Sequence, residues 1–458
     1  MSLKMNSIEQ KAVIGLSSIL SLRMIGLFMV LPIFTLYAQT LSGATPLLIG
    51  LAVGIYGLAQ AIFQIPLGAL SDHIGRKPII LMGLIIFILG SLVCAFSHSI
   101  FLMILGRLLQ GVGAIGSTIL AFIADFTREE QRTKSMAIAG ITIGFSFSIA
   151  MFLGPVLTQW MPVNQLFLIA SVLGISAMIL LYTVVPTPTI HHWQRDTEPE
   201  LKSFLKMLIR PELAKLNSGI LILHALFTAS FVIIPLSLLH FGDLPASRQW
   251  HLYLPTLLAG FFICLLAIGL AERKRQIKPY FLGAILTLAI AELCLWASSL
   301  NEAFAIAGLC LFFGAFSLLE AFLPSLISRT APAGNKGTAL GIYSSSQFLG
   351  IFVGGVLGGW LYSRFSFSGV YLFCITLALF WFILAYRMQP PLYLITQTLK
   401  LLPNKHPHWE LIAAKLQSIP GMIEITLIAE DSAAYLKMER ETAENPDFLR
   451  LKEQLQSM

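Results

Sequence analysis

Gly68-Ala-Leu-Ser-Asp72-His-Ile-Gly75-Arg76-Lys77 lies between two long apolar runs of the chain. It contains one acid, two glycines and two adjacent cations. Such a composition is typical of a solvated turn, because charged side chains stay in water and glycine permits a sharp change of direction. The apolar runs on either side indicate which class of protein carries this turn.

The composition indicates a membrane protein. Of 458 residues, 56% are hydrophobic and only 12% are charged, with a mean hydropathy of +0.80. A soluble domain averages about 25% charged residues. All five cysteines lie in apolar runs and none forms a C-x-x-C pair, so we interpret them as core residues and expect no metal site; they are Cys94, Cys264, Cys294, Cys310 and Cys374.

Twelve apolar runs are long enough to cross about 30 Å of hydrocarbon. Six lie near residues 12–39, 48–71, 78–97, 100–126, 134–160 and 164–186, and six lie near 217–240, 250–271, 279–299, 303–329, 337–364 and 367–388. The first run is too long for a cleavable signal and carries Arg23 in its middle. The predicted fold is therefore an all-α membrane protein with two six-helix halves, 1–186 and 217–388, a cytoplasmic linker, 187–216, and a small tail domain, 389–458.

The distribution of cations predicts the orientation, because cytoplasmic loops are enriched in Lys and Arg. With the N-terminus in the cytoplasm, the outside connections hold only Arg248 and Arg364. The inside connections hold Lys4, Lys11, Arg76, Lys77, Arg128, Arg132, Lys134, Arg195, Lys202, Lys206, Arg210, Lys215, Arg273, Lys274, Arg275, Lys278, Arg329, Lys336 and Arg387. We therefore expect both termini in the cytoplasm, and we attribute the net charge of +7 to topology and not to a nucleic-acid surface.

The stretch 68–77 resembles the loop between the second and third helices of the major facilitator superfamily, G-x-L-x-D-x-x-G-R-K, at every fixed position. The resemblance implies that Asp72 and Arg76, with Asp125 at the end of the fourth span, form a latch that joins the two halves in the outward-open state. The predicted latch residues are Gly68, Asp72, Gly75, Arg76, Lys77 and Asp125. The alternative is an ordinary surface ion pair, worth about 0–1 kcal/mol.

Two charged residues inside the spans are candidates for proton coupling. Arg107-Leu-Leu-Gln110-Gly111-Val-Gly113-Ala114 resembles the fourth-helix motif R-x-x-Q-G-x-G-A of the superfamily, which is associated with proton coupling. Residues 107, 110, 111 and 114 share one helical face, so we expect Arg107 and Gln110 to point the same way. Glu320 lies in the tenth span, where it can exchange a proton or serve as a structural ion-pair or hydrogen-bond partner. Glu292, nearer the outer edge, is interpreted as structural.

Polar residues within apolar spans should face the bundle interior and not lipid. In the second span Tyr56, Gln60 and Gln64 form a stripe at intervals of four. They either line a substrate path or make helix–helix hydrogen bonds. The substrate-cavity candidates are Arg23, Tyr56, Gln60, Gln64, Gln110 and Gln347.

Small residues in the fifth and eleventh spans predict close helix contacts. Around Gly154-Pro155 the fifth span resembles the antiporter motif of the superfamily, although Ala150 and Thr158-Gln159 replace three of its glycines. The resemblance favours export with counter-ion exchange. The predicted seam between the halves consists of Gly140, Gly144, Gly154, Pro155, Gly350, Gly354 and Gly355.

The tail, 389–458, has a soluble-type composition. We expect strands near 393–400, 422–429 and 433–439 and helices near 408–418 and 446–456, which is the start of a ferredoxin-like unit. The segments around Ile419-Pro-Gly-Met422 and Ala433-Ala-Tyr-Leu-Lys437 resemble its heavy-metal-associated version, but the M-x-C-x-x-C metal loop is absent. His406 and His408 are interpreted as part of a polar turn.

Taken over its whole length, the chain resembles the YajR-like transporters of the superfamily. This resemblance implies a proton-driven exporter of small, drug-like molecules in the bacterial inner membrane, with a ligand of unknown identity on the tail domain. The expected partners are lipid, protons and a small-molecule substrate, and the expected energy source is a proton gradient without a cofactor. No nucleotide loop or nucleophile elbow is present, so we do not expect an enzyme. The alternative function is a membrane sensor whose bundle or tail binds a ligand.

Overall fold

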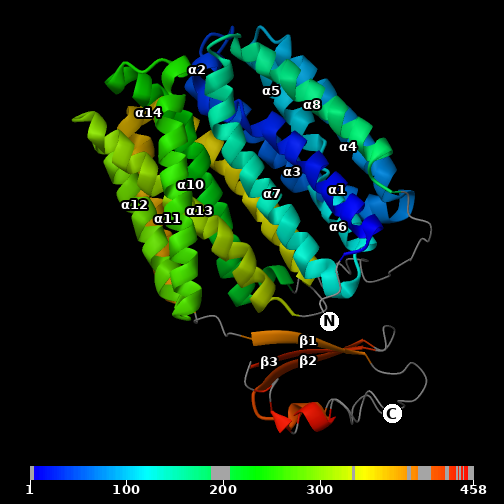
Figure 1. Ribbon diagram of the computed structural model, residues 1–458. Coiled ribbons are helices and arrows are strands. Elements are labelled where there is room, and N and C mark those ends of the chain that lie inside the picture. Colours follow the sequence, from blue (N-terminus) through cyan, green and yellow to red (C-terminus); the bar gives the residue numbers. More distant parts are fainter. Residues whose placement is uncertain are drawn as a thin grey trace.

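The computed structural model describes residues 5–186, 207–332, 336–388, 394–400, 414–428, 433–439, 442, 445–446 and 448–451. Most of the predicted linker, residues 187–206, lies outside these ranges, as do His406 and His408. Figure 1 shows a bundle of long helices with a small sheet below it, at the end of the bundle where the N-terminus lies.

Two sets of apolar helices form the bundle. The N-terminal half consists of α1 (Ser7–Phe28), α2 (Leu31–Ala38), α3 (Pro46–Ile74), α4 (Arg76–Ala95), α5 (Ile100–Val112), α6 (Gly116–Phe126), α7 (Glu129–Leu157) and α8 (Val163–Thr183). The C-terminal half consists of α10 (Pro211–Gly242), the short η2 (Ala246–Arg248), α11 (Trp250–Arg273), α12 (Ile277–Ala297), α13 (Glu302–Thr330) and α14 (Lys336–Tyr386).

Within the described residues, 11 helical segments are long and apolar enough to cross a membrane. The last of them, Gly337–Tyr386, has 50 residues and contains both of the last two predicted spans. The two spans are separated at Ser366, whose φ of +56° is not helical. The spans expected from hydropathy are therefore all present as helices.

Two spans are interrupted near their middle. The first breaks between α1 and α2, and the fourth breaks between α5 and α6 at residues 113–115. The expectation that Ala114 shares a face with Arg107 is wrong, because α5 ends at Val112 and Ala114 lies in the break. Ala114 is fully buried, which fits the rule that non-helical backbone at membrane depth is enclosed by protein.

The two halves meet along α3 and α14, at contacts we call the α3–α14 seam. Glycines on α3 face the backbone of α14: a methyl group added at Gly54 would lie 2.9 Å from the carbonyl oxygen of Phe352, and one at Gly57 would lie 2.6 Å from that of Phe348. At Gly50 the added methyl would collide with the carbonyl of Gly355. Only glycine permits this approach, and such small residues are how helices in lipid pack closely.

The seam covers only one end of the bundle. Gly68 lies 18 residues beyond Gly50 and so on the same face of α3, but a methyl group there would meet only Ser117 of its own half. On α14, Gly341 has no atom within 4 Å of such a methyl. The halves therefore diverge from the seam toward the end of the bundle that lies nearer the sheet, as the paths of α7 and α10 show in Figure 1.

Of the predicted seam glycines, Gly154, Gly350 and Gly354 do not contact the opposite half, and for these three the prediction is wrong. A methyl group at Gly140 or Gly144 would meet nothing within 4 Å. The others pack within one half. Gly154, next to Pro155 of α7, contacts the carbonyl of Met29, while Gly350 and Gly354 contact the backbone of α10 at Leu221 and Ala225. Of the predicted set only Gly355 contacts the opposite half, at Gly50 and Gly54.

The described part of the tail is a three-stranded antiparallel sheet of β1 (Leu394–Lys400), β2 (Met422–Ile428) and β3 (Ala433–Glu439) in the order β1-β3-β2. The strand predictions are confirmed to within a residue. A small core of its own, including Leu416, Leu436 and Phe448, packs against the sheet.

We expect Gly355→Leu to force the seam apart, because even its Cβ would lie 2.6 Å from the carbonyl oxygen of Gly50 and 2.9 Å from the Cα of Gly54. Overpacking of this kind costs about 1–3 kcal/mol. Spin labels at Leu47 and Arg364, near the closed end, should show longer distances by double electron–electron resonance.

Gly341→Leu is the matched control, since it adds the same side chain to α14 where a Cβ meets nothing. Its distance distribution should equal that of the parent protein. An unchanged distribution in a folded Gly355→Leu variant would contradict the assignment of the seam.

Candidate functional site

The polar stretch between α3 and α4 forms an ion-pair cluster with the end of α6. Arg76 pairs with Asp72 at 2.5 Å (Nη2–Oδ1) and with Asp125 at 2.9 Å (Nε–Oδ2). Its Nη1 donates to Ser71 Oγ at 2.6 Å. Gly75 joins the two helices with φ +106°, a conformation that side-chain-bearing residues rarely adopt. The pairing of Arg76 with Asp125 that we expected is observed, and we call Asp72, Arg76 and Asp125 the loop cluster.

The loop cluster joins three helices of the N-terminal half and does not bridge the halves in this conformation. It lies at the end where the halves diverge, near Gly68, which packs on Ser117. A latch across the two halves therefore stays a prediction for a conformation in which this end is closed.

Lys77 lies apart from the loop cluster. Its Nζ donates to the carbonyl oxygen of Val185 at 2.8 Å and lies 6.0 Å from the ring centre of Tyr182, so it caps the end of α8. Positive charge at a helix C-terminus is favourable because carbonyl groups there lack intrahelical donors.

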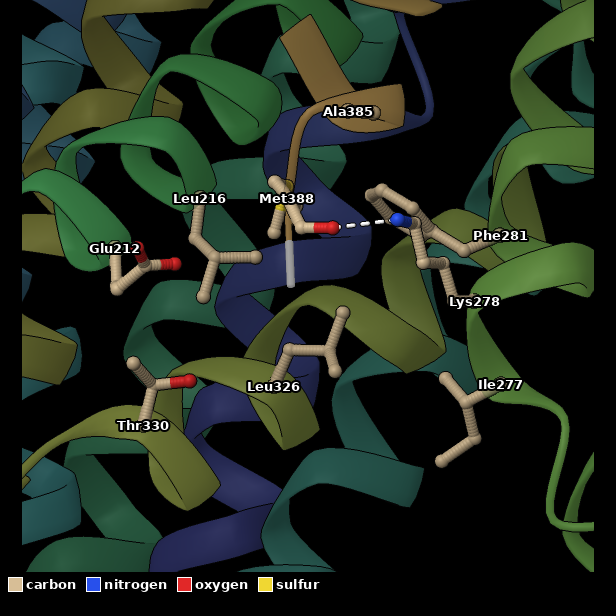
Figure 2. Close-up of a pocket in the computed structure, with 9 residues that line it drawn as sticks. All are labelled: Glu212, Leu216, Ile277, Lys278, Phe281, Leu326, Thr330, Ala385 and Met388. Carbon is tan, nitrogen blue, oxygen red and sulfur yellow. Dashed lines mark hydrogen bonds between the residues drawn. The ribbon is translucent and has the colours of Figure 1, made fainter. Parts of the chain in front are cut away.

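Lys278 repeats this arrangement in the C-terminal half. Its Nζ donates to the carbonyl oxygens of Tyr386 at 3.0 Å and Met388 at 2.5 Å, and it lies 5.7 Å from the ring centre of Tyr386. Figure 2 shows the bond to Met388 beside a cavity lined by Glu212, Leu216 and Leu326 among others. Its volume of about 40 Å³ is far below the several hundred Å³ of a typical ligand pocket, so we do not assign it a substrate.

A buried acid near the chain start was missed by sequence reasoning. Glu9, on the first turn of α1, accepts from Arg128 at Nε (2.8 Å), Nη2 (3.0 Å) and the backbone nitrogen (3.1 Å). It also accepts from the backbone nitrogen of Asn6, which caps α1. The N-cap spacing Asn6–Glu9 was a readable signal, but the partner 119 residues away was not.

The interior of the N-terminal half contains a polar network around the fourth-span motif. Arg107 Nη1 donates to Gln110 Oε1 at 2.8 Å, and Gln110 Nε2 donates to Ser91 Oγ at 2.8 Å. The guanidinium also lies 4.4 Å from the ring centre of Tyr56. Arg107 and Gln110 thus point the same way, as the motif predicted.

Arg23 lies in the same interior and is fully buried. Its Nη2 donates to Gln60 Oε1 at 3.3 Å, while Nε and Nη1 have no hydrogen-bond partner among the described residues. Gln64, one turn beyond Gln60 on α3, is also buried. The five cavity candidates of this half, Arg23, Tyr56, Gln60, Gln64 and Gln110, are thus enclosed by protein in this conformation and line no open path.

In the C-terminal half, Gln347 of α14 connects two titratable groups. Its Nε2 donates to Glu320 Oε1 of α13 at 3.1 Å and contacts His224 Nε2 of α10 at 2.9 Å. The Glu320 side chain remains 36% exposed, whereas His224 is almost fully enclosed. Sequence reasoning found Glu320 and Gln347 but missed His224, the one histidine within an apolar stretch of α10 remote from its ends.

A second acid of this half is sealed. Glu292 of α12 is fully buried and accepts from Ser230 Oγ of α10 at 2.5 Å. This single hydroxyl partner agrees with a structural interpretation of Glu292. Of the two acids, Glu320 has the more exposed side chain, although its Oε2 is buried and has no hydrogen-bond partner among the described residues.

The sequence that forms these sites matches a known protein family. The family model described as Major Facilitator Superfamily matches residues 16–354 and, in a second match, residues 249–401. The chain belongs to the major facilitator superfamily. It is therefore a multi-pass membrane transporter, and the superfamily resemblance of residues 68–77 is confirmed.

Relatives and solved structures agree with this membership. The inner membrane transport protein YajR of Escherichia coli is 43% identical over 95% of this chain and 96% of its own length. The class B tetracycline resistance protein of Escherichia coli is 33% identical over 32% of this chain and 35% of its own length. The crystal structure of a D-xylose–proton symporter superposes with a TM-score of 0.66 at 15% identity, covering 84% of this chain and 99% of the symporter, which supports the fold.

We expect Glu9→Gln to lower the midpoint temperature of unfolding of the purified transporter. The change removes the charged acceptor of Arg128, and a hydrogen bond between charged groups contributes about 1.5–3 kcal/mol. Glu302→Gln is the control, because Glu302 also occupies the first turn of an Asn-capped helix but is exposed. Equal midpoints for both variants would show that the Glu9–Arg128 pair is not a stabilising contact.

Proposed function

We propose that this transporter is a proton-coupled antiporter that exports small, drug-like molecules by alternating access. The observation that carries the proposal is the Glu320–Gln347–His224 network inside the C-terminal half. It holds an acid with a partly exposed side chain and a buried Oε2 that has no hydrogen-bond partner in the described part of the chain. The tetracycline and methylenomycin resistance proteins among the relatives support export as the direction.

The contacts of His224 fit a neutral imidazole protonated on Nδ1. Its Nδ1 donates to the carbonyl oxygen of Ile220 at 3.3 Å, so Nε2 is free to accept from Gln347. A proton on Nε2 would remove that acceptor and turn the 3.8 Å contact with Glu320 into an ion pair. A proton on Glu320 would instead make the whole network neutral. The position of one proton thus changes which helices among α10, α13 and α14 are joined.

The network is connected to the α3–α14 seam by sequence neighbours on α14. Gln347 precedes Phe348, whose carbonyl oxygen faces Gly57 of α3. Besides His224, the titratable group beside Glu320 is Tyr343, which lies one turn before Gln347 on α14. Its hydroxyl has no hydrogen-bond partner among the described residues. Protonation removes the charge of Glu320, and a neutral side chain costs less free energy to enclose in the low-dielectric interior than a charged one. Because Gln347 and Phe348 are neighbours on α14, we expect this change to shift the equilibrium between the closed and open forms of the α3–α14 seam.

In the proposed cycle, the end carrying the loop cluster faces the cytoplasm, as the distribution of cations favours. The conformation described here is then inward-facing, with the outer end closed at the seam. In the outward-facing state the loop cluster would contact the C-terminal half and act as the latch. A sensor function is not favoured, because YajR, which matches over nearly the whole chain, is a transport protein.

The tail is proposed to be a ferredoxin-like regulatory domain. The strand order β1-β3-β2, with both neighbours antiparallel, supports this class.

The test is transport by purified protein in proteoliposomes with an acidic lumen. The probe panel contains a quaternary ammonium dye, a neutral dye and a sulfonated dye, chosen because none is trapped by pH alone. Antiport requires uphill accumulation of at least one dye in the acidic compartment, driven by protons that leave. A transport rate that does not respond to the pH gradient would contradict proton coupling.

Glu320→Gln should abolish the uphill component while downhill exchange of the same dye continues, because the amide mimics the protonated acid and cannot release a proton. Glu302→Gln, which removes an exposed acid from the same helix, should transport as the parent does. Uphill accumulation by Glu320→Gln at the parent rate would assign the proton to another group.

The latch is tested by Asp72→Asn with the spin labels at Leu47 and Arg364. Losing an ion pair worth about 0–1 kcal/mol should enrich the short-distance, inward-facing population by up to about fivefold. Asp243→Asn, at the exposed end of α10, is the control. Identical populations in the parent and Asp72→Asn would contradict the latch.

A further inference from the structure

The interior of the N-terminal half holds two guanidinium groups and no described acid that pairs with them. Neither Arg23 nor Arg107 takes part in any of the salt bridges among the described residues. Both side chains are almost completely buried. A buried charge without a counter-charge is costly, at several kcal/mol per ion, so this interior favours an anionic partner.

Arg23 has the greater unused capacity of the two. Arg107 is held by Gln110, by the carbonyl oxygen of Ala52 at 3.4 Å and by the face of Tyr56. Arg23 has only the long bond to Gln60, a contact with the Phe87 ring at 5.7 Å, and two unpartnered nitrogen positions, Nε and Nη1. Nε and Nη1 lie on different edges of the guanidinium, so each can donate separately to an oxygen of a carboxylate or a related oxyanion.

The position of Arg23 connects it to the moving part of the transporter. Its partner Gln60 and the nearby Tyr56 flank Gly57, which contacts the carbonyl oxygen of Phe348 across the α3–α14 seam. Arg23 and Arg107 thus lie on the inner side of α3, and another side of α3 forms the interface between the halves. Opening of the seam would uncover α3 and, with it, the route to Arg23.

We propose that Arg23, oriented by Gln60, binds the anionic group of the transported compound, so that the substrate class includes organic carboxylates and zwitterions. The inference rests on the proposed transport function and adds the chemical class to it. The substrate carboxylate supplies a counter-charge that no described acid provides, and Arg107 adds a second positive charge to the same interior.

The experiment measures binding at constant pH, without a gradient, to the full-length protein in detergent. The probes are 2-naphthoate and 2-naphthamide, which share the ring and differ in charge, and the readout is isothermal calorimetry. Naphthoate should bind more tightly than the amide, and Arg23→Gln should weaken naphthoate binding at least about tenfold, as expected for loss of a charge-assisted hydrogen bond. Arg248→Gln, which removes one exposed cation at the end of the bundle away from the sheet, should bind naphthoate as the parent does.

A second variant tests the site without removing the arginine. Gln60→Glu places a carboxylate where an amide oxygen now lies 3.3 Å from Arg23 Nη2, so it should abolish naphthoate binding and raise the unfolding temperature. Naphthoate binding that is absent in the parent, equal to amide binding, or unchanged in both Arg23→Gln and Gln60→Glu would overturn the proposal. Proton-driven movement of the quaternary dye would then still stand, which separates this failure from a failure of the proposed transport.

Discussion

Where α3 meets α14, backbone touches backbone, because Gly50, Gly54 and Gly355 leave no side chain between the helices. Lipid tails are as apolar as leucine, so helices in a membrane are held by close packing and not by the hydrophobic effect. The glycines concentrate this packing at one end of the bundle. Toward Gly68 and Gly341 the same helix faces have no partner in the opposite half, and the bundle is therefore closed at one end and divergent at the other.

The charged side chains inside the bundle are divided between the halves. The N-terminal half holds Arg23 and Arg107, and the C-terminal half holds Glu320 and the sealed Glu292. Each half is thus unbalanced by itself, and the imbalance has opposite sign on the two sides of the seam. A proton at Glu320 reduces the negative charge on one side, while an anion at Arg23 would reduce the positive charge on the other.

Hydropathy and short motifs in the sequence predicted the structural features that depend on neighbouring residues. Hydropathy located the spans, including the break at Ser366, because each span must satisfy its own backbone in lipid. The loop cluster and the Arg107–Gln110 pair followed from short motifs with defined spacing. The tail strands followed from their alternation of residues.

Contacts between segments far apart in the sequence could not be predicted from these patterns. The partner of Glu9 lies in a distant connection, at the N-cap of α7, and the role of His224 appears only when α10, α13 and α14 come together. Gly154 of α7 was misassigned, because small residues allow close packing but do not say which helix approaches. It packs inside its own half, against the carbonyl of Met29, whereas a methyl group at Gly140 or Gly144 would contact no described atom.

Lys278 holds the carbonyl oxygens of both Tyr386 and Met388, the last described residue before the tail. Lys278 lies at the start of α12, so these two bonds attach the C-terminal end of α14 to a second helix. Both helices belong to the same half. The bonds of Lys278 thus tie the residue that precedes the tail to the half that contains Glu320.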